Sequence, residues 1–137
     1  KKMSKSELSD LSRINLTDDK DLIINKIKKA KTDPLAMPSS VEELNKRPEA
    51  KNLLGIYSSL TNSSLEKSIQ IFEGKNFSEF KEKLSEVMVD KIEPISVEIK
   101  KLINDKSYLD KILFDGCQKA NNIASIKIKK LQGIVGF

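Results

Sequence analysis

The first six residues of the chain carry three lysines and two serines at a spacing suited to holding a triphosphate. They read Lys1-Lys2-Met3-Ser4-Lys5-Ser6, so that a hydroxyl side chain follows each of the last two lysines within two residues. A lysine ammonium is a compact point charge for phosphate oxygens, and hydroxyls and backbone N–H groups add short-range donors. The same residues are equally typical of a polar chain terminus. The elements that follow must therefore decide between the two interpretations.

The first of these elements is a helix predicted from Thr17 onward. Thr17 or Asp18 can cap it, and acidic residues in the first turn face the positive end of the helix dipole. Apolar residues recur at three- and four-residue steps, with lysines around the other side: Leu22, Ile23, Ile27 and Ala30 against Lys26, Lys28, Lys29 and Lys31. Asp18 and Asp19 could instead form a paired-carboxylate catalytic or metal site. Adjacent helical side chains do not face each other, which favours capping.

The rest of the chain is predicted to be helical as well. A loop with Pro34 and Pro38 ends the first helix, and Ser40 is a weaker helix start interrupted at Pro48. Further helices are expected over residues 49–60, 63–72, 78–104 and 107–133. Their signals are capping-box patterns at Ser63–Glu66 and Ser107–Asp110, a stop at Gly74, and a kink near Val89 to Asp90 caused by Pro94.

No alternating pattern typical of a strand occurs, so the expected fold is all-α, a bundle of about five helices joined by short turns. Tyr57 and Cys117 are both predicted to lie in its core, Tyr57 with its hydroxyl at the edge. The lysines scattered over the later helices are interpreted as a solvated face.

Composition excludes several classes of function. The 137 residues suffice for one domain, and the net charge of +5 is compatible with polyanion binding without demanding it. One cysteine and no histidine leave no intrachain disulfide, no zinc site and no Ser-His or Cys-His catalytic pair. Apolar runs are too short for a membrane span, and no apolar segment follows the basic start. A cytoplasmic protein is expected.

Nine segments, taken in order, resemble one family. Residues 2–6 are KMSKS, the signature loop of class I aminoacyl-tRNA synthetases, and the later segments are similar to the C-terminal part of bacterial-type tryptophanyl-tRNA synthetases. These later segments are Arg13-Ile14-Asn15-Leu16, Asp18-Asp19, Ala30-Lys31-Thr32-Asp33, Asn52-Leu53-Leu54-Gly55-Ile56-Tyr57, Phe72-Glu73-Gly74-Lys75-Asn76-Phe77-(two residues)-Phe80-Lys81, Glu93-Pro94-Ile95, Tyr108-Leu109-Asp110 and Lys119-Ala120-Asn121. The resemblance covers essentially the whole chain.

The chain departs from the family pattern in two places. Residues 35–47 fit only loosely, as a variable loop would. The family's HIGH-type motif contains histidine and precedes KMSKS, but this chain has no histidine. We therefore expect a fragment whose Rossmann domain and tryptophan pocket lie upstream. In that case residues 1–17 are the KMSKS loop and linker, and residues 18–137 are the C-terminal helical domain that binds the tRNA anticodon.

The resemblance implies a reaction and a set of site residues. The family activates L-tryptophan with ATP and passes the adenylate to tRNA(Trp). Lys5 and Lys2 would be the catalytic lysines that hold the phosphates, with Met3, Ser4 and Ser6 also near the nucleotide. Magnesium would arrive on the ATP phosphates, without a protein metal site. No membrane partner is implied, and the parent enzyme would be a homodimer.

Two alternatives stay open. The same chemistry could serve tyrosine instead of tryptophan. A stand-alone, non-catalytic helical module that binds RNA or protein is the other, with KMSKS accidental. As a fragment of a synthetase, the isolated chain is expected to be inactive, because it would hold only part of an active site.

Overall fold

The computed structural model describes residues 9–136, and within them every regular element is helical. This confirms the all-α prediction. A short 3₁₀ helix precedes six α-helices: η1 (Asp10–Ser12), α1 (Lys20–Lys29), α2 (Val41–Asn45), α3 (Pro48–Thr61), α4 (Leu65–Phe72), α5 (Phe77–Asn104) and α6 (Lys106–Val135). The number exceeds the five expected because the weak start at Ser40 does form a helix, α2. The side-chain oxygen of Ser40 accepts a hydrogen bond from the backbone N–H of Glu43 at 3.2 Å.

The chain divides into two compact units, one ending at Val97 and the other beginning at Glu98. The boundary falls inside α5, three residues after Pro94. Helix α5 is continuous across Pro94, and the kink expected there stays a prediction. The division of roles expected at residue 17 also stays a prediction, because compactness does not report on function.

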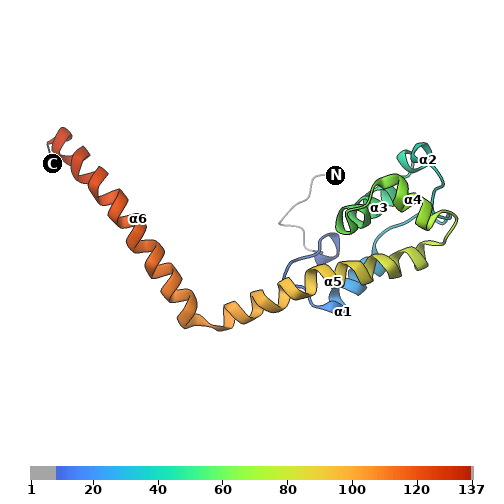
Figure 1. Cartoon of the computed structure of the whole chain (residues 1–137), viewed down its shortest axis with the longest axis horizontal. Coiled ribbons are helices and arrows are strands. Elements are labelled where there is room, and N and C mark those ends of the chain that lie inside the picture. Colours follow the sequence, from blue (N-terminus) through green and yellow to red (C-terminus); the bar gives the residue numbers. More distant parts are fainter. Residues whose placement is uncertain (1–8, 137) are drawn as a thin grey trace. The chain divides into compact units, whose positions relative to one another are not determined.

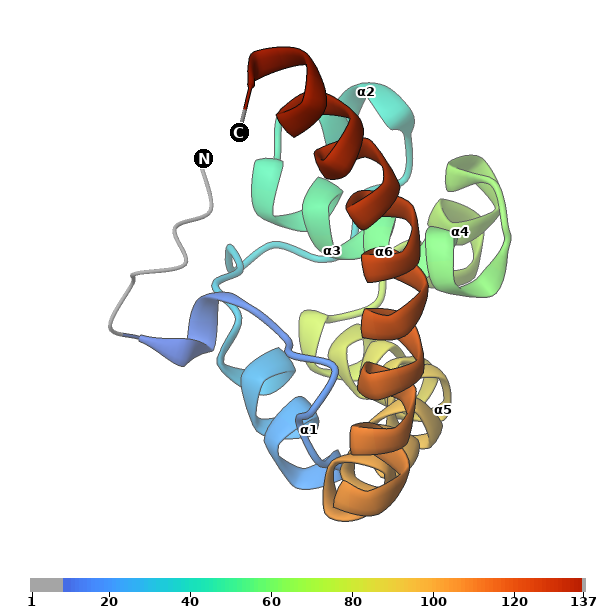
Figure 2. The same ribbon diagram turned by 90° about the vertical axis from the view of Figure 1, so that its left-hand side faces the viewer.

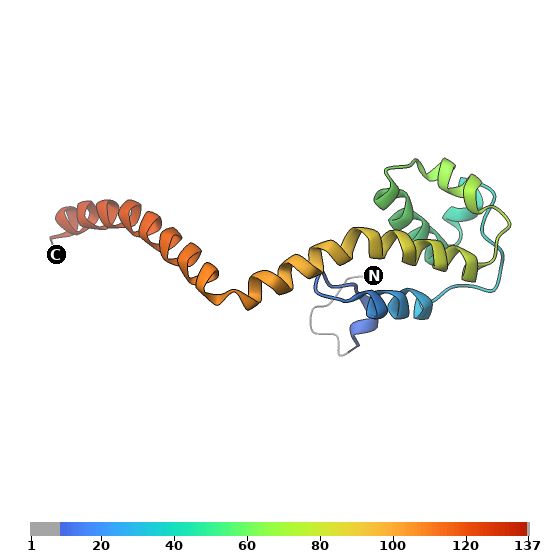
Figure 3. The same ribbon diagram turned by 60° about the horizontal axis from the view of Figure 1, so that its bottom comes forward.

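The core of the first unit is built where α1, α3, α4 and α5 turn their apolar faces toward one another. Figures 1 and 3 show α1 along one side of the first half of α5, with α2, α3 and α4 gathered on the other side. Phe72 and Phe80 are fully buried at its centre, with their ring centroids 4.9 Å apart and an edge-to-face geometry. Tyr57 packs edge-on against Phe72 at 4.8 Å, which confirms its assignment as a core aromatic.

Three of the predicted helix starts are displaced by one or two residues. Asp19, and neither Thr17 nor Asp18, caps α1 by accepting the N–H of Leu22 at 2.9 Å. Ser64 replaces Ser63 as the cap of α4, and Asp105 replaces Ser107 as the cap of α6. In each pair the observed cap has extended or irregular backbone, which a cap requires. The predicted cap instead makes other hydrogen bonds, as Asp18 and Ser63 do, or lies inside the helix, as Ser107 does.

The connection between α4 and α5 follows the sequence signal at Gly74, whereas α5 begins at Phe77, one residue before the predicted start at Ser78. Gly74 ends α4 with a φ of +71°, a left-handed conformation that glycine adopts without strain. Two residues later, the side chain of Asn76 accepts the N–H of Glu79 at 2.9 Å and starts α5. This hairpin brings Phe72 and Phe80 into contact.

The second unit contains the end of α5 and the whole of α6. Figure 2 draws α6 as one continuous helix. Helix α6 buries no side chain, although it carries apolar residues at helical spacing. Cys117 is exposed, so its predicted place in the core is wrong. The spacing identified the helix correctly, but spacing alone does not supply the packing partner that burial needs.

The core predicts a clear contrast between two isoleucines of the first unit. Ile23 is fully buried in α1, whereas Ile71 in α4 is 48% exposed. Ile23→Ala should lower the free energy of unfolding by about 2–5 kcal/mol through lost burial and the cavity left behind. Ile71→Ala is the matched control and should cost less than about 1 kcal/mol. Urea denaturation followed by circular dichroism measures both, and equal losses would contradict the described core.

Candidate functional site

The predicted phosphate-binding residues lie outside the described part of the chain. Lys2, Met3, Ser4, Lys5 and Ser6 all precede Ser9, where the description begins. Their roles therefore stay predictions. The structure does describe the segment that follows them directly, and this segment sets where the motif is attached.

That segment, residues 9–19, is held by side-chain hydrogen bonds to backbone. Ser9 caps η1 by accepting the N–H of Leu11 at 3.4 Å. Asp18 closes the next turn from both directions: its N–H donates to the carbonyl of Asn15 at 3.1 Å, and its carboxylate accepts the N–H of Asn15 at 2.9 Å. The chain thus enters α1 through two tight turns.

A buried lysine of α1 binds this segment. Lys26 is only 3% exposed, and its Nζ donates to Oδ2 of Asp10 at 2.5 Å and to Oδ2 of Asp18 at 2.6 Å. Burial lowers the pKa of Lys26, but the hydrogen bonds to Asp10 and Asp18 outweigh burial and raise that pKa above its ordinary value. The hydrogen bond from Lys26, and then the one from Asn15, hold the pKa of Asp10 below its ordinary range. Lys26 and Asp10 are therefore charged at neutral pH.

This cluster corrects the sequence interpretation in two respects. Lys26 was expected on the solvated side of the helix, and it is buried because two carboxylates compensate its charge. Asp18 is neither a cap nor half of a carboxylate site with Asp19: Asp18 is buried against Lys26, while Asp19 caps α1 and is exposed. The signal that sequence reasoning could have used is the spacing Asp18 to Lys26, two helical turns.

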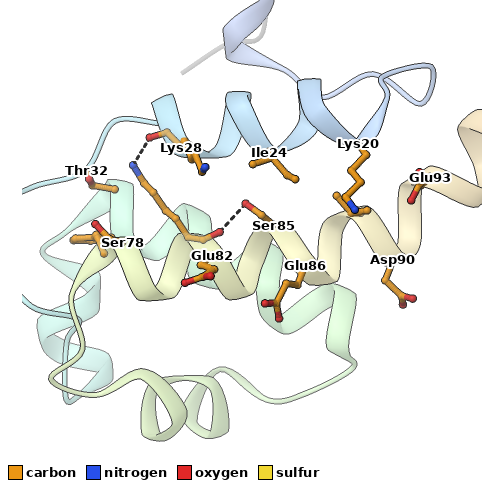
Figure 4. A pocket seen from close by; sticks show the side chains of 13 residues that line it. Lys20, Ile24, Lys28, Thr32, Ser78, Glu82, Ser85, Glu86, Asp90 and Glu93 are labelled. Atoms are coloured by element: carbon orange, nitrogen blue, oxygen red, sulfur yellow. Dashed lines mark hydrogen bonds between the residues drawn. The ribbon is translucent and has the colours of Figure 1, made fainter.

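A groove of about 1020 Å³ lies between α1 and the first half of α5. Its lining has three lysines and four carboxylates, Lys20, Lys28, Lys81, Glu82, Glu86, Asp90 and Glu93, with Ile24 and Val89 among its apolar residues. Figure 4 shows the acidic side chains following one another along α5. The Nζ of Lys81 donates to the carbonyls of Lys28 and Ala30 at the end of α1, and burial lowers its pKa. Such a lining does not favour a phosphate.

A second buried cation holds the loop between α1 and α2. The guanidinium of Arg47 pairs with both carboxylate oxygens of Asp33, at 2.6 and 2.9 Å, and donates to the carbonyls of Ala36 and Leu35. It also lies over the ring of Phe77 at 5.6 Å. The sequence placed residues 35–47 in a loosely fitting variable loop and missed this fixed point.

The described residues contain no group of three or more His, Cys, Asp or Glu side chains arranged to hold a metal ion. None of the helices described is long and apolar enough to cross a membrane.

Comparison with known proteins decides the family. The family described as "tRNA synthetases class I (W and Y)" matches residues 1–92, which include KMSKS, the Lys26 cluster and the core of the first unit. The chain belongs to this family.

The relatives extend the match over the rest of the chain. The tryptophan–tRNA ligases of Mesorhizobium japonicum and Agrobacterium fabrum are each 48% identical over all 137 residues, which cover 39% of those proteins. The tryptophan–tRNA ligase of Rickettsia felis is 50% identical over the same residues, 41% of its length. The chain therefore spans about two-fifths of the length of these curated relatives.

The Asp33–Arg47 pair predicts a pH dependence of stability. The hydrogen bond from Arg47, the largest of its causes, lowers the pKa of Asp33. A depressed carboxyl pKa contributes stability that is present above pH of about 4 and lost as the pH falls through the folded-state pKa. Asp33→Asn should therefore be less stable at pH 7 and should lose less stability than the wild type between pH 5 and 3.

Urea denaturation across this pH range measures the effect. Asp110→Asn makes the same change at an exposed position of α6 for which the described residues give no side-chain hydrogen bond, and it should keep the wild-type pH dependence. Parallel curves for Asp33→Asn and the wild type would contradict the predicted linkage.

Proposed function

We propose that this chain is the part of a tryptophan–tRNA ligase that carries the KMSKS loop and the helical domain following it. The observation that carries the proposal is identity near 48% over the whole chain to ligases named for tryptophan, together with KMSKS at residues 2–6. The ligase activates L-tryptophan with ATP and transfers it to tRNA(Trp). The Rossmann domain and the tryptophan pocket would be contributed by sequence not included in these 137 residues.

The chemistry assigned to the motif is charge stabilisation without a covalent intermediate on the protein. The tryptophan carboxylate attacks the α-phosphorus of ATP, and negative charge grows on the departing pyrophosphate. Lys5 and Lys2 would meet that charge, while the hydroxyls of Ser4 and Ser6 donate hydrogen bonds and Met3 lies near the nucleotide. Magnesium would enter bound to the ATP phosphates. The rate then depends on how accurately this short segment is positioned.

The helical remainder is assigned to tRNA. Exposed lysines, such as Lys29 at the end of α1 and Lys31 just after it, can neutralise backbone phosphates and would make the affinity salt-dependent. The groove between α1 and α5, with its four carboxylates, is a poor phosphate site, so we assign the contacts to the exposed lysines outside it. Homodimerisation and a cytoplasmic location remain predictions from the family.

The decisive variant is Lys5→Ala in the full-length ligase. Losing one well-placed donor to developing charge costs about 3 kcal/mol, or roughly a hundredfold in rate. Tryptophan-dependent exchange of pyrophosphate into ATP should fall by at least that factor, while tryptophan binding measured by calorimetry survives.

Lys46→Ala, an exposed lysine before α3, is the matched control and should retain wild-type exchange. An unchanged exchange rate in Lys5→Ala would overturn the assignment of the motif. Exchange supported by tyrosine but not by tryptophan would assign the chain to the sister specificity instead.

The isolated 137-residue chain should not activate tryptophan. It carries one wall of the proposed site and none of the nucleotide-binding sheet, and half of a preorganised site does not orient its reactants. Pyrophosphate exchange with the purified chain should stay at the level of the buffer blank, while the full-length ligase at equal concentration exchanges. Measurable exchange by the chain alone would contradict the proposed division of the site.

A further inference from the structure

The buried ammonium of Lys26 has a structural cost that its surroundings do not require. In the sequence of α1, Lys26 is next to the buried Ile27 and three residues from the buried Ile23. An apolar side chain of similar length would fill the same space. Replacing a buried ion pair by well-packed apolar residues is often neutral or stabilising. The presence of a lysine therefore points to a role other than stability alone, and the groups that it binds indicate which.

Lys26 holds η1 in place from a distance of sixteen residues in sequence. Asp10, the first residue of η1, accepts hydrogen bonds from Lys26 at 2.5 Å and from Asn15, and pairs with Arg13 at 2.9 Å. η1 buries no side chain of its own, and Leu11 within it is 47% exposed. Without apolar burial, these charge-assisted bonds are what keeps η1 against α1.

Removing the ammonium would drive the two carboxylates apart. Asp10 and Asp18 both accept from the same side-chain amide of Asn15, at 3.2 and 3.3 Å, so their charges lie close together. Lys26 supplies the positive charge between them. With that charge gone, like charges repel, and the more exposed carboxylate moves, which is Asp10, with 45% of its side chain exposed against 5% for Asp18.

Asp10 is the attachment point of the segment that contains KMSKS. Five residues separate it from Lys5, a reach of at most about 18 Å in a fully extended chain. If Asp10 is released, the next residue packed on the core is Ile14, nine residues from Lys5, and the reach grows to about 32 Å.

We propose that Lys26, through Asp10 and Asp18, is a positioning residue that fixes the attachment of the KMSKS segment and so places Lys5 for the departing pyrophosphate. This inference rests on the proposed function. Lys26 touches no substrate in it, and it acts only through the segment that Asp10 begins. Its effect should therefore fall on the chemical step and spare tryptophan binding.

The test is a double-mutant cycle in the full-length ligase, with pyrophosphate exchange as the readout. Lys26→Met should lower kcat by about ten- to a hundredfold, the range expected when a group is misplaced by about an ångström, with the KM for tryptophan within about twofold of wild type. If Lys26 acts through Lys5, the double variant Lys5→Ala/Lys26→Met should be no slower than Lys5→Ala alone. Asn25→Met, which also places a methionine at an exposed position of α1, is the control and should match the wild type.

Asp10→Ala keeps the proposal testable if Lys26→Met does not fold. The side chain of Asp10 is 45% exposed and η1 buries nothing, so this variant should fold and reproduce the loss of kcat. Wild-type kcat in Asp10→Ala, or losses from Lys5→Ala and Lys26→Met that multiply in the double variant, would overturn the positioning role. A wild-type rate in Lys5→Ala would overturn the proposed function itself, which separates the two failures.

Discussion

The edge-to-face contact between Phe72 and Phe80 is the interaction on which the first unit depends. It joins α4 to α5 across the turn at Gly74, and Tyr57 adds α3 to the same cluster. The backbone of Met37 then pairs with this turn, since its N–H donates to the carbonyl of Lys75 at 2.8 Å and its carbonyl accepts from Gly74. One aromatic cluster thereby fixes three helices and the loop that leads into α2.

Segments outside the α-helices are held by charge-assisted hydrogen bonds and not by apolar packing. Residues 10–18 and 33–36 bury little apolar surface, and each is tied to a helix by one buried cation that reaches back 14 or 16 residues to an aspartate. Lys26 does this for Asp10, and Arg47 for Asp33. A charge-assisted hydrogen bond is directional and roughly twice as strong as a neutral one, so a single side chain can position a loop that has no core of its own. The packed helices stabilise the first unit, and the two buried cations position these two segments against it.

The sequence predicted what depends on periodicity and failed where a partner distant in sequence decides. The helical fold, the turn at Gly74, the loop between α1 and α2 and the core position of Tyr57 follow from local patterns, and all are confirmed. Lys26 looks like a solvated residue by spacing, and Arg47 ends the segment expected to be a variable loop. Only the carboxylates brought near them by the fold reveal both as buried. Cys117 fails in the opposite sense, because an apolar helical stripe is buried only if another surface covers it. The candidate phosphate site was predicted from the resemblance and lies at residues 2–6, outside the described part.

Three cations of the first unit are already bound by acceptors within the protein, so phosphate binding is left to other residues, such as those of the motif. Arg47 is fully engaged by Asp33 and backbone carbonyls, Lys26 is neutralised by two carboxylates, and Lys81 donates to the carbonyls at the end of α1. The cations that the fold buries are therefore committed to structure and have no remaining capacity for a polyanionic substrate. In the ligase proposed above, the positive charge for the ATP phosphates would lie on a short segment outside the core, and that segment would need a rigid attachment. The turns at Asp10 and Asp18, closed around Lys26, provide such an attachment immediately after KMSKS.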